Sequence, residues 1–89
     1  MTPTSTPTDA RYRELDSVVL RRDVPEAGLR AGDVGTVVWV YGHDALEVEF
    51  VTGSGRPQAV RTLAVADVRA LADDDLPAVR SVGVVPGAA

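Results

Sequence analysis

The stretch Ala31-Gly32-Asp33-Val34-Gly35-Thr36-Val37-Val38 decides the fold. Its Gly-Asp pair favours a tight turn, and the second glycine allows a close backbone approach or a bulge where the next strand begins. The valine-rich run that follows is β-branched, which suits a pleated strand better than a helix. We therefore expect a turn that leads directly into a central strand over residues 36–41.

Four other segments have the character of strands. Residues 17–20 are apolar, and residues 46–50 alternate between apolar and acidic side chains, the period-two pattern of a half-buried antiparallel strand. Residues 58–63 and 68–71 complete the set, with turns expected at 25–28, 42–44 and 52–57 and a tight or 3₁₀ turn at 64–67. Five short strands, a long first loop and a tight turn before the last strand predict an all-β fold, a small five-stranded antiparallel SH3-like barrel.

The length of the chain, 89 residues, suffices for one domain and not for two. We expect residues 1–13 to form a disordered N-terminal arm, residues 14–80 the barrel domain, and residues 81–89 a flexible C-terminal tail. The stretch 10–16 has the length of a single helical turn that packs onto the domain. The acidic run 73–75 is expected to be a solvated surface, and residues 76–79 to dock as an extended piece.

The composition excludes several classes of function. The formal net charge is −4 and all nine basic residues are arginine, which argues against non-specific binding to a phosphate backbone. The absence of cysteine removes disulfides, thiolate metal ligands and thiol catalysis. Without an apolar stretch long enough to span a bilayer or a signal-peptide pattern, we expect a cytoplasmic protein.

No set of residues predicts catalysis. His43 is the one histidine and lies in a predicted turn, so neither a catalytic triad nor a zinc site can be assembled around it. Glu47 and Glu49 share a strand face that we interpret as solvent-exposed. The glycine-containing turns at 32–35 and 53–55 lack the spacing and the lysine of a phosphate loop. We expect a protein that is not an enzyme and that holds no metal or cofactor.

A binding surface remains as the source of function. Trp39 and Tyr41 share a face if their strand is regular, and four arginines lie on or beside strands. Tryptophan, tyrosine and arginine are the residues enriched at interface hot spots. The alternative for Trp39 is a place in the core, as is common for the lone tryptophan of a small barrel. The candidate partner-binding residues are Trp39, Tyr41, Arg21, Arg22, Arg61 and Arg69.

The chain also resembles a family of small bacterial proteins, the domain-of-unknown-function 4926 family. The resemblance is carried by the runs Glu14-Leu15-Asp16-Ser17-Val18-Val19-Leu20, Asp23-Val24-Pro25-Glu26-Ala27-Gly28-Leu29 and Gly32-Asp33-Val34-Gly35-Thr36-Val37-Val38. It continues through Tyr41, Glu47-Val48-Glu49-Phe50 and Ala66-Asp67-Val68-Arg69, and extends over residues 14–80. It implies an SH3-like fold, no known catalysis, and a role as the small partner in two-gene modules, such as an antitoxin or immunity protein. No site residues are carried over from it.

Three functions compete at this point. The first is a non-catalytic protein-binding module that neutralises a partner, such as a toxin or an enzyme encoded beside it, since an acidic surface suits a basic target. The second is a nucleic-acid-binding barrel of the KOW type, supported by the glycine-valine turn and the arginines and opposed by the net acidity. The third is an accessory subunit domain of a larger enzyme. The oligomeric state stays open.

Overall fold

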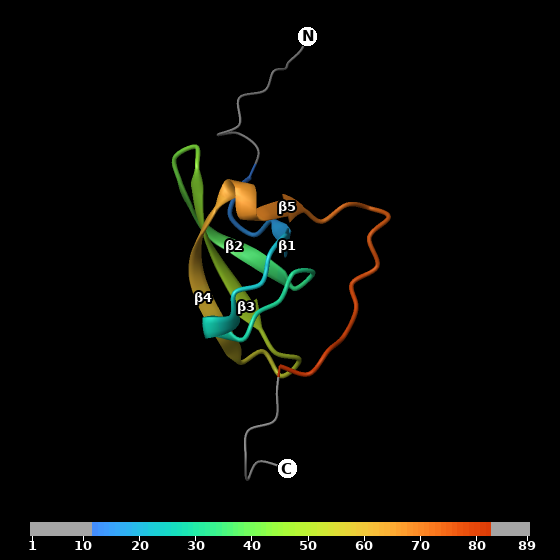
Figure 1. The fold of residues 1–89 in the computed structure, drawn as a ribbon. Coiled ribbons are helices and arrows are strands. Elements are labelled where there is room, and N and C mark those ends of the chain that lie inside the picture. Colours follow the sequence, from blue (N-terminus) through green and yellow to red (C-terminus); the bar gives the residue numbers. More distant parts are fainter. Residues whose placement is uncertain (1–11, 83–89) are drawn as a thin grey trace.

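A computed structural model describes residues 12–82, which form one antiparallel sheet (Figure 1). Its order is β4-β3-β2-β1-β5, and every neighbouring pair is antiparallel. The predicted all-β fold with five antiparallel strands is confirmed. The elements are β1 Ser17–Leu20, η2 Pro25–Ala27, β2 Val34–Tyr41, β3 Ala45–Val51, β4 Pro57–Ala64, η3 Val65–Asp67 and β5 Val68–Ala70, where η marks a 3₁₀ turn.

The turn η3 carries the chain from one edge of the sheet to the other. The amide of Val65 donates to the carbonyl of Asp44 at 2.9 Å, and the carbonyl of Asp67 accepts from the amide of Arg21 at 2.8 Å. Strand β5 then pairs with β1, while β4 pairs only with β3 among residues 12–82. Ladder hydrogen bonds in this part of the chain therefore do not close the sheet between β4 and β5. Neither 3₁₀ turn in residues 12–82 has the length or apolar character that crossing a membrane requires.

The core lies on one face of the sheet and under the long first loop. No polar or charged residue of residues 12–82 is buried, so burial of apolar surface stabilises the fold. The predicted alternation over residues 46–50 is confirmed, because Leu46, Val48 and Phe50 are buried and the two glutamates between them are not. The core cluster consists of Tyr12, Val18, Leu20, Val24, Leu29, Val37, Leu46, Val48, Phe50, Leu63 and Val68.

Gly35 is needed because two core side chains from β3 lie directly against its backbone. A Cβ atom at this position would lie 2.6 Å from Val48 Cγ1 and 2.7 Å from Phe50 Cε2. Real Cβ atoms essentially never come so close, and both neighbours are buried and have no room to move. The close backbone approach expected at the second glycine of the Gly-Asp-Val-Gly stretch is therefore present.

The segment before β1 differs from the expected helical turn. The amide of Asp16 donates to the carbonyl of Arg13, which makes a tight turn, and Leu15 has a φ of 78° that no helix accommodates. The amide of Leu15 and the carbonyl of Asp16 instead bond to the backbone of Val37, which prolongs the β1–β2 ladder. Leu15 is 80% exposed, whereas Tyr12, placed by the sequence in the arm, packs into the core.

The rest of the expected N-terminal arm, residues 1–11, lies outside the described residues, as do residues 83–89 of the expected tail. The acidic run 73–75 and residues 76–79 belong to a segment, residues 71–82, that we call the strap. Figure 1 shows the strap leaving β5 and arcing away from the sheet to reach the turn between β3 and β4.

Gly35→Ala should destabilise the domain by about 1–3 kcal/mol, because the added methyl group overpacks the core against Val48 and Phe50. The matched control is Gly53→Ala. Gly53 lies in the β3–β4 turn without a positive φ, and no atom lies within 4 Å of the place that a methyl group would occupy there. Chemical denaturation of both variants measures the effect. Equal stabilities would contradict the close contact at Gly35.

Candidate functional site

A β-bulge in β2 turns Trp39 and Tyr41 away from the core. Val37 lies opposite Val48 and Trp39 lies opposite Glu47, so Val38 is an extra residue without a partner on β3. One extra residue sends every following side chain to the other face of the sheet. Val37 is fully buried, whereas Trp39 is 54% and Tyr41 46% exposed. The two aromatic residues share a face, as predicted, although the strand is not regular. This face is the outer one, so the core alternative for Trp39 is wrong.

Polar side chains from β3 and β4 adjoin these rings. Glu47 is the cross-strand neighbour of both Trp39 and Thr62. Its Oε1 atom accepts a hydrogen bond from Thr62 Oγ1 at 2.6 Å and a longer one from the Tyr41 hydroxyl at 3.4 Å. The carboxylate is therefore held in one orientation beside the indole. We call the set of Trp39, Tyr41, Glu47 and Thr62 the aromatic–acidic patch.

The patch continues along the outer face of the sheet. Glu49 follows Glu47 on β3 with the same orientation and lies across from Val60, which is 48% exposed. Within residues 12–82, no ion pair involves Glu47 or Glu49. Partial desolvation and the neighbouring Glu47 carboxylate raise the pKa of Tyr41 above its ordinary value. The patch therefore combines apolar rings with two carboxylates, neither of which forms an ion pair with an arginine of residues 12–82.

Three of the four candidate arginines are engaged in ion pairs within the chain. Arg22 Nε lies 3.1 Å from Asp67 of η3, and Arg61 Nη2 lies 2.9 Å from Glu26 of η2. Arg69 forms two hydrogen bonds with Asp75 in the strap, at 2.7 and 3.1 Å. Arg22 and Arg61 connect elements that are distant in the sequence, whereas Arg69 and Asp75 are six residues apart. The structure does not gather them around Trp39 and Tyr41.

The remaining candidate, Arg21, follows β1 at the surface, and its backbone amide binds η3. His43 is exposed in the hairpin between β2 and β3. Among residues 12–82 there is no group of three or more histidine, cysteine, aspartate or glutamate side chains placed to hold a metal ion.

The acidic run 73–75 is less solvated than expected at its last member. The Asp75 carboxylate accepts from Arg69 and from the backbone amide of Ala72 at 2.7 Å, which fixes the start of the strap. These hydrogen bonds, first of all that from Arg69, lower the pKa of Asp75. The last residue of the run thus anchors the strap. Asp75 lies three residues after Ala72 and six after Arg69, which are the two residues that donate to it.

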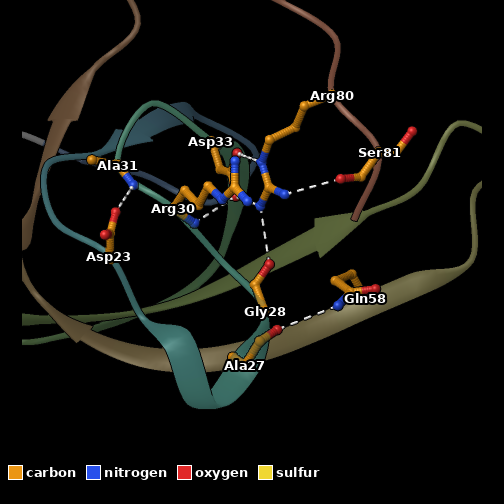
Figure 2. A network of polar contacts seen from close by, with 9 residues as sticks. All are labelled: Asp23, Ala27, Gly28, Arg30, Ala31, Asp33, Gln58, Arg80 and Ser81. Atoms are coloured by element: carbon orange, nitrogen blue, oxygen red, sulfur yellow. Dashed lines mark hydrogen bonds and ion pairs between the residues drawn. The ribbon is translucent and has the colours of Figure 1, made fainter. Parts of the chain in front are cut away.

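A second anchor at the other end of the strap was not predicted. Arg80 Nε and Nη2 donate to the two carboxylate oxygens of Asp33 at 2.8 and 2.5 Å, and Nη2 also donates to the carbonyl of Gly28 (Figure 2). Asp33 lies in the turn before β2 and also accepts from the amide of Arg30. The hydrogen bond from Arg80 is the main reason that the pKa of Asp33 is lowered. No local signal in the sequence pairs two residues that are 47 positions apart.

Between these anchors the strap lies over a hollow of about 270 Å³. Val34 and Val51 line it from the sheet, and Pro77 and Ala78 line it from the strap. Leu76 and Val79 of the strap are almost wholly exposed. Pro77 and Ala78 are exposed as well, so residues 76–79 do not dock onto the domain as expected.

Arg80→Gln should lower the melting temperature at neutral pH by about 2–5 °C, because it removes the partner of Asp33. The pKa of Asp33 in the folded protein is below its ordinary value of 3.8, so the ionised carboxylate stabilises the fold above that pH. This contribution is lost as the pH falls through the folded-state pKa, and the difference between the variant and the wild type should shrink there.

Thermal unfolding measured across acid pH tests this expectation. Arg22→Gln is the control, because its ion pair with Asp67 is more exposed and should contribute less. A melting temperature of Arg80→Gln that equals that of the wild type at every pH would show that Arg80 does not stabilise the fold.

Fold and patch together define a small all-β domain that presents aromatic and acidic side chains on the outer face of its sheet. Residues 14–70 match the family described as Domain of unknown function (DUF4926), and this match covers more than half of the chain. The protein belongs to this family, which confirms the resemblance, although the match ends at Ala70 and not at Arg80. No curated protein and no solved structure matches the chain. The patch lies within the matched region and the strap lies after it.

Proposed function

We propose that the protein is a non-catalytic protein-binding module that holds a partner through the aromatic–acidic patch. The observation that carries the proposal is the half-exposed pair Trp39 and Tyr41 on the outer face of β2. Large aromatic side chains exposed together are typical of interaction surfaces, since they bury much apolar area when a partner covers them. The β-bulge at Val38 places them on this face and not in the core.

Electrostatics supports a protein partner over a nucleic acid. Arg22, Arg61 and Arg69 are paired with carboxylates, so they offer little free positive charge to a phosphate backbone. The outer face instead presents Glu47 and Glu49, and the chain as a whole carries a net charge of −4. Such a surface complements a basic protein and speeds its association. An antitoxin- or immunity-like role, in which this chain neutralises a basic protein encoded beside it, fits these properties.

Co-expression of the full chain with the protein of the adjacent gene tests the proposal. The wild type should co-purify with that protein, and Trp39→Ala should weaken the affinity at least about 30-fold, the effect of losing a hot-spot residue. Because the side chain is 54% exposed, the same change should reduce stability by less than about 1 kcal/mol. Calorimetric titration and thermal unfolding of the same samples give both values.

Val79→Ala is the matched control, because Val79 is a fully exposed apolar residue of the strap and not of the patch. It should leave the affinity unchanged. Failure of the adjacent protein to co-purify, or equal binding by Trp39→Ala and the wild type, would overturn the proposal.

A further inference from the structure

We infer that the aromatic–acidic patch accepts an arginine side chain of the partner, stacked on Trp39 and paired with Glu47. This inference rests on the proposed function and specifies the chemistry of the partner at that site. It is carried by the position of a carboxylate, oriented by two hydroxyl groups, directly across the ladder from an exposed indole.

The Glu47 carboxylate uses only one of its two oxygens within the described part of the chain. Both hydroxyl groups, from Thr62 and Tyr41, donate to Oε1, and no hydrogen bond of residues 12–82 reaches Oε2. A carboxylate accepts at both oxygens, so Oε2 retains the capacity to accept a hydrogen bond from a partner. Because Thr62 and Tyr41 already hold the group in place, a ligand that binds Oε2 does not need to order the side chain first.

The indole of Trp39 lies within reach of the same ligand. Directly opposed residues of an antiparallel pair have Cβ atoms about 5 Å apart, so a cation that pairs with Glu47 also lies close to the Trp39 ring. A cation within about 6 Å of an indole centroid is attracted to the face of the ring. The guanidinium group of arginine satisfies both sites together, because it is planar, stacks on aromatic rings and carries donors along its edge.

The surroundings of the patch favour the same ligand. Glu49 adds a second carboxylate on the same face, and within residues 12–82 no arginine forms an ion pair with either glutamate. Val60 and Tyr41 supply apolar contact for the alkyl part of an incoming side chain. An arginine of the partner would therefore find carboxylates to pair with, an indole to stack on and apolar side chains to contact, all on one face of the sheet.

Trp39 is the one tryptophan of the chain, so its fluorescence reports directly on the patch. We would titrate the full chain at low salt with a capped peptide of alternating glycine and arginine. The matched peptides carry lysine or the uncharged isostere citrulline in place of arginine. The arginine peptide should give a saturating change, the citrulline peptide none, and the lysine peptide weaker binding.

Glu47→Gln keeps the shape of the side chain and its contact with Thr62, and should weaken binding of the arginine peptide by about three- to tenfold. The control is Asp73→Asn, which removes the same charge from the strap and should leave binding within about twofold. Equal losses in the two variants would show general attraction to an acidic protein and overturn the inference, as would equal binding of the arginine and citrulline peptides. Lysine binding as tight as that of arginine would overturn the stacking on Trp39.

The outcomes separate this inference from the proposed function. If the adjacent protein binds through Trp39 while the arginine peptide gives no response, the binding module stands and the arginine site is wrong. If the peptide binds as expected while no adjacent protein co-purifies, the arginine site stands and the proposed partner is wrong.

Discussion

The bulge at Val38 is the constraint on which both the core and the outer face of this protein depend. Strand β2 enters the sheet with Val37 in the core, and a regular strand would carry Trp39 inward after it. The extra residue reverses the alternation, so that Val40 packs against the core and Trp39 does not. A single unpaired residue thus keeps the largest ring of the chain out of the core and places it where it can meet another molecule.

Much of the fold could be predicted because its signals are local. The clean alternation in residues 46–50, the β-branched run after Gly35 and the tight turn before the last strand each act within a few residues. The side to which Trp39 points could not be predicted, since a bulge is defined only by the pairing of β2 with β3. The ion pair between Arg80 and Asp33 could not be predicted either, because it also depends on contacts between distant parts of the chain. The two residues meet only where the strap returns to the sheet (Figure 1).

The use of arginine explains how an acidic face stays unbalanced in a chain with nine arginines. Arg22, Arg61 and Arg80 each join one segment of the chain to another, through Asp67, Glu26 and Asp33. Their charge is neutralised in these connections at the loops and turns. Glu47 and Glu49 lie in the middle of a regular strand, and their contacts run to hydroxyl and apolar groups. The separation of paired and unpaired charge is therefore a result of the topology.

The contacts between η2 and β4 also bear on self-association of the protein. Strand β4 is an edge of the sheet, and an uncovered edge is a template on which another chain can add a strand and start aggregation. Here the strand begins with Pro57, which has no amide hydrogen to donate, and η2 is tied to it by Arg61 with Glu26 and by Gln58 with the carbonyl of Ala27. Two features therefore oppose extension of the sheet at this strand: the missing amide hydrogen of Pro57, and the side-chain contacts that hold η2 against β4.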